Sequence, residues 1–219
     1  MNFEEYYFDS VSGENLDILF EHGFRHFGIH FYRYSHGFLN EAQVTVLPLR
    51  IQLSNFILSK SQKKILRKND KFKFIIRDCF INTEKLDLFE KHKMRFKDNI
   101  PESIYNFIYP TNPHCVPCEM KEISVYDSER LIAVSFLDIG KISTSSIYGM
   151  FHPEYSEFSL GIYTMLLEIQ FSLEHNKKLY YPGYAYREPS FYDYKKKFIG
   201  LESFYWESYS WLPFQRLET

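Results

Sequence analysis

The stretch that decides the fold is Ser159–Lys197, SLGIYTMLLEIQFSLEHNKKLYYPGYAYREPSFYDYKKK. Apolar residues recur at helical spacing as far as His175, which predicts a helix with one buried face. Leu179–Tyr184 is too short and too aromatic for another helix, so it predicts a buried strand that Pro182 and Gly183 end. A loop rich in tyrosine and lysine follows this strand.

The loop has a composition that suits the binding of single-stranded nucleic acid. Aromatic faces stack on unpaired bases, and ammonium groups bind the backbone phosphates. The same residues are equally compatible with a solvated loop that only packs against the core. The side chains concerned are Tyr184, Tyr186, Arg187, Tyr192, Tyr194, Lys195, Lys196 and Lys197.

A second basic segment begins at Ser59–Gln62, which has the form of a helix capping box. In this motif the serine side chain accepts hydrogen bonds from amides of the first turn, and the glutamine side chain bonds back to the serine backbone. Its cations fall on one side of a helix and are opposed only by Asp70. Ile65 and Leu66 are left to anchor the helix. The stripe predicts phosphate binding, although a run of charge is also typical of a solvated face. It consists of Lys60, Lys63, Lys64, Arg67 and Lys71.

The rest of the chain alternates short strands with two further helices. Gly23 is expected to end the first helix in the left-handed conformation, and Pro48 to mark an edge or a bulge. Residues 35–40 are expected to form a loop. Antiparallel strands followed by one long helix and a further strand predict an α+β or mixed α/β domain. Strands are expected at 24–34, 44–53, 72–77, 119–126, 131–137, 142–151 and 201–214, and helices at 15–22 and 83–96.

The composition narrows the class of protein. A length of 219 residues allows one large domain or two small ones, and an aromatic content of 19% suggests that some rings serve a surface. The formal charge of −2 gives no global signal for nucleic acid, so such binding would need local patches. Apolar runs are too short to span a membrane, and Met1–Glu5 is acidic where a secretory signal would be basic, so we expect a cytosolic (cytoplasmic) protein.

The three cysteines are Cys79, Cys115 and Cys118, an odd and sparse set that argues against a disulfide framework. The C-x-x-C pair in His114–Cys118 supplies half of a tetrahedral zinc site, which Cys79 or His114 would have to complete. A redox motif would open a helix after a strand, whereas this pair lies in a proline-rich loop before a strand. Reduced structural cysteines, a metal site and a redox pair are the three interpretations.

Several short blocks run in the order seen in one known family. In the first half they are Leu16-Asp17, Phe20–Gly28 (FEHGFRHFG), Phe31–Arg33, Leu47–Ile51 (LPLRI) and Ser59–Asn69 (SKSQKKILRKN). In the second half they are Arg130–Val134, Ser159–Gly161 with Tyr163, Tyr180-Tyr181, Gly183-Tyr184, and Tyr194-Lys195 with Phe198. The chain thereby resembles the aminoacyl-tRNA–protein transferases, the arginyltransferases and their bacterial leucyltransferase branch, over most of its length.

The resemblance implies an α/β (α+β) chain with an acetyltransferase-like (GNAT) fold, in which a mixed, mostly antiparallel central sheet is flanked by helices. Residues 1–75 would form the N-terminal part with the basic helix, and 76–219 the catalytic part, within one compact unit. The implied reaction is attack by a protein's N-terminal α-amine on the ester that joins an amino acid to the 3′ adenosine of tRNA. Leucine is the preferred donor and arginine the alternative, and the acceptor would begin with Asp or Glu, or else with Arg or Lys, and be marked for N-degron degradation.

The resemblance and the local chemistry together suggest the residues of the site. Glu168 is expected to hold the amine or assist removal of its proton, unless it is a surface residue of the helix. Tyr181 and Tyr184 are expected to line the aminoacyl-adenosine pocket, and Tyr181 is expected to be catalytic together with Glu168. The residues expected to bind tRNA are Lys60, Ser61, Lys63, Lys64, Arg67, Tyr184, Tyr194 and Lys195.

The chain also departs from the family pattern. The family's metal- or cluster-associated cysteines are absent from Ser35–Gln43, and its Cys-Pro-Lys-Met run is replaced by Arg187–Phe191. We therefore expect no cofactor and no metal, and a monomer whose partners are aminoacyl-tRNA and an acceptor N-terminus, without DNA or membrane. Two other functions stay open: a coenzyme A-dependent acetyltransferase, whose phosphate loop needs glycines that His152–Leu160 lacks, and a non-catalytic tRNA-binding relative.

Overall fold

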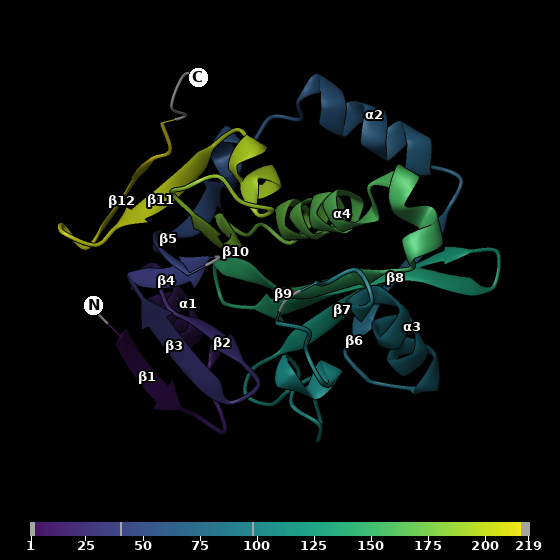
Figure 1. Ribbon diagram of the computed structural model, residues 1–219, viewed down its shortest axis with the longest axis horizontal. Helices are drawn as coiled ribbons and strands as arrows, with labels where there is room; N and C mark the ends of the chain where they lie inside the picture. Colours follow the sequence, from purple (N-terminus) through teal and green to yellow (C-terminus); the bar gives the residue numbers. More distant parts are fainter. Residues whose placement is uncertain (1–2, 40, 98, 216–219) are drawn as a thin grey trace.

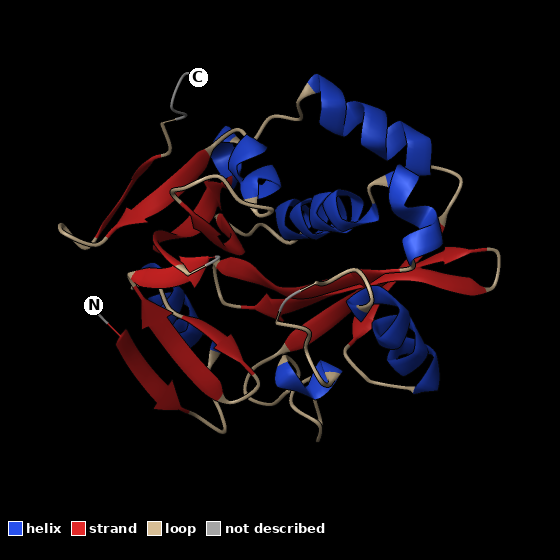
Figure 2. Cartoon of the chain, viewed as in Figure 1, coloured by secondary structure: helices blue, strands red, loops and turns tan. Residues whose placement is uncertain are grey.

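The computed structural model describes residues 3–39, 41–97 and 99–215. Within them, one central sheet contains nine strands (Figures 1 and 2). The strands are β4 (His36–Leu39), β5 (Ala42–Gln52), β6 (Lys73–Asp78), β7 (Met120–Asp127), β8 (Arg130–Ile139), β9 (Ser143–Phe151), β10 (Leu179–Tyr186), β11 (Leu201–Tyr205) and β12 (Ser210–Pro213). Their order is β12-β11-β5-β10-β9-β8-β7-β6, and β4 pairs with β5. Among the described strands of this sheet, β9 and β10 pair in parallel and the other pairs are antiparallel.

Helices cover both faces of the central sheet. The helices α2 (Lys60–Asn69) and α4 (Leu160–Glu174) lie on one side and α3 (Thr83–Lys93) on the other (Figure 1). Successive side chains of β8 point to opposite faces of the sheet. Ala133 packs in the buried cluster that contains residues of α4, and Val134 packs in the cluster that contains residues of α3. Among the helices of the described residues, none is long and apolar enough to cross a membrane. Short 3-10 turns are η1 (Leu53–Asn55), η2 (Ile104–Asn106), η3 (Pro153–Phe158) and η4 (Asp193–Lys197).

A smaller antiparallel sheet from the N-terminal part lies beside the central one (Figure 1). Helix α1 (Gly13–Glu21) packs between them, since its Leu16 and Phe20 share a buried cluster with Tyr181 of β10. The strands of the small sheet are β1 (Phe3–Tyr7), β3 (His30–Tyr34) and β2 (Arg25–Phe27), in this order.

The predicted mixed, mostly antiparallel sheet with flanking helices is confirmed. The capping box at Ser59 is present with both of its hydrogen bonds, and Gly23 follows α1 with φ of +80°. Pro48 lies where β5 has lost one neighbour, because the pairing with β4 ends at Thr45 and that with β11 begins at Leu49. No partner strand therefore needs an N–H group from the proline.

Four expectations differ from the structure. The strand expected at 24–34 is broken into β2 and β3 by a turn at Gly28, whose φ is +52°. The described part of the expected loop 35–40 forms β4 and makes a hairpin with β5. Helix α4 is buried nearly all round rather than on one face, because α2 covers its outer side. The expected boundary at 75/76 falls inside β6.

The strands β9 and β10 separate after a short parallel pairing of Leu179–Tyr181 with Ser143–Ser145. Beyond it, β10 continues against β5 and β9 against β8, which leaves a gap between them. The Arg25 side chain of β2 fills this gap, and its Nη2 donates to the carbonyl oxygens of Ser146 at 3.1 Å and Ile147 at 3.0 Å. We call this the β9/β10 gap.

Gly183 makes room for the arginine. Its φ is +88°, and a Cβ built there would lie 1.6 Å from Arg25 Nη1. A side chain at this position would therefore strain the backbone and displace the guanidinium from the gap.

We predict that Gly183→Ala lowers the free energy of unfolding by about 3 kcal/mol, because it combines left-handed strain with the loss of charged hydrogen bonds to buried carbonyls. Gly149→Ala is the matched control, since a Cβ there meets its nearest neighbour at 3.8 Å without positive φ. Urea unfolding followed by circular dichroism compares the two variants. Equal stability of both variants would show that Arg25 does not need the glycine.

Candidate active site

The β9/β10 gap holds a buried carboxylate from α4. Glu168 is fully buried, and its Oε2 accepts a hydrogen bond from the Tyr180 hydroxyl at 2.5 Å. Its Oε1 accepts from Ser146 Oγ at 3.3 Å. Burial raises the pKa of Glu168 to about 7, although the hydrogen bonds from Tyr180 and the nearby serines favour the charged form. A carboxyl group with such a pKa can exchange a proton at cellular pH.

Two cations accompany the carboxylate. Lys195 of η4 is 8% exposed, and its Nζ donates to the Tyr184 carbonyl oxygen at 3.2 Å. Burial, together with the positive charge of Arg25, lowers the pKa of Lys195 well below its usual range, and Glu168 opposes this effect. Arg25, Glu168 and Lys195 thus form one charge cluster at the gap.

Partly exposed tyrosines surround the mouth of the gap. Tyr32 stacks on Tyr34 with ring centroids 5.9 Å apart, and Tyr186 meets Tyr192 edge to face at 5.6 Å. Burial raises the pKa of Tyr34 and of Tyr194 to about 12, so their hydroxyl groups stay neutral at cellular pH. These tyrosines, which we call the tyrosine wall, are Tyr32, Tyr34, Tyr148, Tyr186, Tyr192 and Tyr194.

The structure separates two residues that the sequence had grouped as catalytic. Glu168 lies in the charge cluster, whereas Tyr181 points to the opposite face of β10 and packs against Phe20, with ring centroids 5.2 Å apart, and Trp211. Successive side chains of a strand alternate between its faces, so Tyr180 and not Tyr181 contacts Glu168. Sequence analysis missed this role of Tyr180, because two adjacent tyrosines in a short strand give no signal of which one faces the helix.

Tyr184 and Lys195 lie deeper than residues that bind tRNA at the surface. The Tyr184 hydroxyl donates to the Gly23 carbonyl oxygen at 2.7 Å, which fastens β10 to the N-terminal part. Lys195 is buried against the Tyr184 carbonyl, so its ammonium does not face solvent as a phosphate-binding lysine would. Tyr194 alone of these three is partly exposed at the mouth.

The basic stripe of α2 faces solvent. Ile65 and Leu66 anchor the helix as expected, and they pack on the same core cluster as Tyr192 and Tyr194. The stripe therefore lies on the same side of the sheet as η4 and α4 (Figure 1). All of its members are exposed, namely Lys60, Lys63, Lys64, Arg67 and Lys71, and Ser61, which was also expected to bind tRNA, is exposed beside them.

Arg25 was not assigned a role from the sequence, although it lies in one of the quoted blocks, Phe20–Gly28. Its function depends on contacts more than a hundred positions away in the chain, to Ser146 and Ile147. Only its place in that block could have drawn attention to it.

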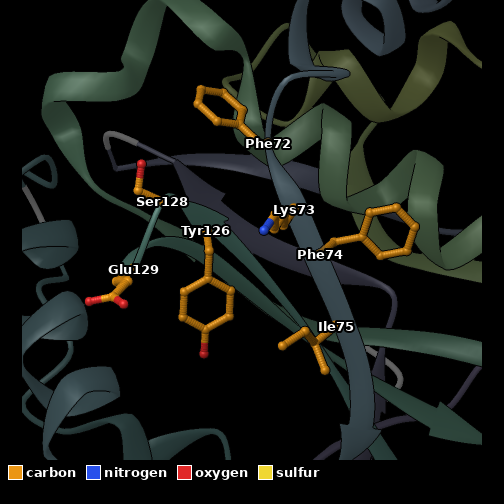
Figure 3. A pocket seen from close by; sticks show the side chains of 7 residues that line it. All are labelled: Phe72, Lys73, Phe74, Ile75, Tyr126, Ser128 and Glu129. Atoms are coloured by element: carbon orange, nitrogen blue, oxygen red, sulfur yellow. The ribbon is translucent and has the colours of Figure 1, made fainter.

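A groove of about 500 Å³ lies elsewhere, along β6 and the β7–β8 hairpin (Figure 3). It is open and apolar, and its charged lining residues are Lys73 and Glu129. A much smaller hollow of about 10 Å³ adjoins Arg25 and Gly183. The buried titratable groups at the β9/β10 gap make it the better candidate for chemistry, despite the larger size of the groove.

The metal site that was one of three interpretations of the C-x-x-C pair, completed by Cys79 or His114, does not form among the described residues. Cys115 is exposed, whereas Cys79 and Cys118 are buried in different core clusters. Among the described residues all three thiols are free. Cys118 lies instead beside His26 and Asp138.

The comparisons with known proteins agree with this architecture. Residues 84–205 match the family model described as arginine-tRNA-protein transferase, C terminus. The aspartate/glutamate leucyltransferase of Campylobacter jejuni (serotype O:6, strain 81116) is 30% identical over 201 residues, which are 90% of this chain and 82% of that protein. The protein of the same name from Vibrio vulnificus (strain CMCP6) is 27% identical over 193 residues, which are 87% of this chain and 80% of that protein.

The fold is also shared with a solved structure. FemX superposes with a TM-score of 0.51 at 12% sequence identity, over 80% of this chain and 61% of that one, which shows a common fold alone. The mixed, mostly antiparallel sheet with flanking helices is thus a fold that this chain shares with FemX. The family model covers more than half of the chain, and the relatives match along most of their length. The chain therefore belongs to the aminoacyl-tRNA–protein transferases, the family that its order of sequence blocks had indicated.

Proposed function

We propose that this transferase moves leucine from leucyl-tRNA to the N-terminal aspartate or glutamate of acceptor proteins and thereby marks them for N-degron degradation. The relatives named aspartate/glutamate leucyltransferase support this choice of donor and acceptor. We place the reaction at the β9/β10 gap. The observation that supports this is the buried carboxyl group of Glu168, which has a pKa of about 7 and lies behind the tyrosine wall. Charged tRNA and nascent proteins are present in the cytoplasm, where we propose that the enzyme acts as a monomer.

The proposed reaction depends more on the alignment of the amine and the ester than on a reactive side chain of the enzyme. The neutral α-amine attacks the ester carbonyl, a C–N bond forms, and the C–O bond to the 3′ ribose oxygen breaks. The amine has a reference pKa of about 7.7–8.0, so a good fraction is neutral at cellular pH. Alignment of amine and ester supplies on the order of 7–11 kcal/mol of the reduction in barrier.

Glu168 accepts the amine proton through a hydroxyl group. Ser146 is partly exposed at the gap, and its Oγ donates to Glu168 Oε1 at 3.3 Å. The amine proton passes to Ser146 Oγ while the serine proton moves to Glu168. Glu168 then returns the proton along the same path to the leaving ribose oxygen. Tyr180 holds the other carboxylate oxygen and acts as a positioning residue.

The two substrates approach from surfaces of different chemistry. The tyrosine wall offers ring faces for the terminal adenine and apolar edges for leucine. Arg95 is an exposed cation that interacts electrostatically with Tyr148 and Tyr194 of the tyrosine wall. Its guanidinium group is suited to bind the carboxylate of an acidic acceptor. Lys60, Ser61, Lys63, Lys64 and Arg67 on α2 bind the phosphates of the acceptor stem.

Transfer assays test the choice of substrates. We expect labelled leucyl-tRNA to be used with peptides that begin with Asp or Glu, and arginyl-tRNA or peptides that begin with Arg or Lys to react at least about tenfold more slowly. Arg95→Gln should lower kcat/KM for the acidic peptides, because it removes the pairing charge. A preference for arginyl-tRNA or for basic peptides would overturn the donor or the acceptor assignment. Acetylation of peptides by acetyl-coenzyme A instead would replace the proposed function.

The basic stripe is tested by salt dependence. We predict that Lys63→Gln combined with Lys64→Gln weakens tRNA binding and reduces the slope of log affinity against log salt by about 1 for each lysine. The control is Lys91→Gln with Lys93→Gln on α3, which lies on the other side of the sheet. Fluorescence anisotropy with labelled tRNA at several salt concentrations gives the slopes. An unchanged slope in the α2 variant would remove the stripe from the tRNA site.

The pKa of Glu168 predicts a specific dependence of stability on pH. Its folded-state pKa of about 7 lies above the ordinary value of 4.5, so the folded state binds the proton more tightly between these values. The stability of the wild type should therefore fall as pH rises from about 4.5 to about 7 and stay level above that range. Relative to Glu168→Gln, the loss between pH 4.5 and pH 8 should be on the order of 3 kcal/mol. Denaturant unfolding of both proteins at each pH measures it, and parallel curves would exclude the raised pKa.

A further inference from the structure

Three side chains with metal-ligating atoms meet in the core outside the β9/β10 gap. They are His26 of β2, Cys118 in the segment before β7 and Asp138 of β8. His26 Nε2 lies 2.6 Å from Asp138 Oδ2 and 3.9 Å from Cys118 Sγ, and the three ligand atoms are all within 4.8 Å of one another. Each residue is at most 2% exposed. We propose that this cluster binds a structural Zn²⁺ ion.

The hydrogen bonding of His26 leaves its other nitrogen available. Nδ1 lies 2.8 Å from the Gly28 carbonyl oxygen, which can only accept, so Nδ1 carries a proton. Nε2 faces the Asp138 carboxylate oxygen Oδ2 at 2.6 Å. Two such atoms repel at this distance unless a proton or a cation lies between them. An imidazole whose other N–H group is held by a backbone carbonyl is the usual arrangement of a histidine that binds a metal.

One carboxylate oxygen of Asp138 also lacks a hydrogen bond from the described part of the chain in the absence of a cation. Asp138 Oδ1 is buried and has no hydrogen-bond partner among the described residues. Such an unpaired buried oxygen costs free energy unless a ligand satisfies it. Cys118 Sγ is buried beside both other side chains, 3.9 Å from His26 Nε2. When Zn²⁺ binds, the thiol proton leaves to solvent and the thiolate forms the bond to the metal.

The ligand set and its geometry suit zinc. Nitrogen, sulfur and carboxylate oxygen are the ligands that Zn²⁺ takes in tetrahedral sites, at roughly 2.0–2.3 Å. Two ligand atoms at these bond lengths are about 3.3 Å apart, so Nε2 and Oδ2 need to separate by less than about 1 Å. A water molecule would complete the tetrahedron. The exposed Cys115, the other half of the C-x-x-C pair, has no part in this site.

The position of the cluster gives the metal a structural role. It joins β2 of the small sheet to β8 of the central sheet and to the segment before β7. His26 follows Arg25 directly, so a metal bound to His26 also fixes the arginine that fills the β9/β10 gap. Metal loss would accordingly loosen the contact between the two sheets.

The metal content of the full-length protein tests the proposal. After expression with zinc and dialysis against buffer without chelator, inductively coupled plasma mass spectrometry should find close to one zinc per chain. Cys118→Ser, which keeps the size of the side chain, should lower the zinc content at least about tenfold. Cys79→Ser and Cys115→Ser should keep the full amount, since these thiols lie outside the cluster.

Cobalt substitution gives an independent readout. Co²⁺ in the wild type should produce a thiolate-to-metal charge-transfer band and the visible bands of a tetrahedral site, and both should disappear in Cys118→Ser. Zinc should also raise the melting temperature of the wild type and leave that of Cys118→Ser unchanged. Metal-free wild-type protein that binds no Zn²⁺ on titration, or a Cys118→Ser variant that retains full zinc, would overturn the proposal. These readouts do not involve leucine transfer, so they are separate from any failure of the proposed function.

Discussion

The contact of the Arg25 guanidinium with the edge of β9 is the interaction on which the rest of the site depends. Separation of β9 from β10 leaves the carbonyl groups of Ser146 and Ile147 without a neighbouring strand, and each such buried acceptor would cost about 1–3 kcal/mol if unsatisfied. Arg25 supplies both hydrogen bonds from one nitrogen. The two strands can therefore stay apart beyond their short parallel pairing, with the Arg25 side chain between them.

The same arginine sets the electrostatics of the gap. Burial lowers the pKa of Lys195, the charge of Arg25 lowers it further, and the buried Glu168 opposes this shift. With the lysine proton weakly held and a carboxyl group whose pKa is about 7, the interior can accept or release a proton near neutrality. Because Arg25 belongs to β2, the small N-terminal sheet contributes to the candidate active site. The hydrogen bond from the Tyr184 hydroxyl to the Gly23 carbonyl oxygen, close to Arg25, also fastens β10 to the N-terminal part.

Local rules of spacing and capping were enough to predict the long helix α4, the beginning of strand β10 and the capping box of α2. The predicted end of the strand at Pro182 and Gly183 was wrong, because β10 continues against β5 as far as Tyr186. The face of β10 could not be predicted. Tyr180 and Tyr181 are chemically identical, and only the pairing of β10 with β5 and β9 decides which one meets Glu168. The burial of Lys195 is likewise a property of tertiary packing. His26 and Asp138 lie 112 positions apart, so no motif could join them.

The contacts of helix α2 with the segment before α4 bear on which anionic substrate the fold can bind. In an enzyme that binds the pyrophosphate of a coenzyme, backbone amides at the start of the long helix would face the anion. Here Lys68 Nζ donates to the Glu157 carbonyl oxygen at 2.8 Å, and Asn69 Nδ2 donates to that of Phe158 at 2.9 Å. The segment before α4 therefore presents carbonyl groups to α2, whose side chains cover it. The same contacts turn the lysines of α2 outward. Anionic substrate is thus met by side-chain cations on the outer surface, which suits the long phosphate backbone of a tRNA better than a compact pyrophosphate.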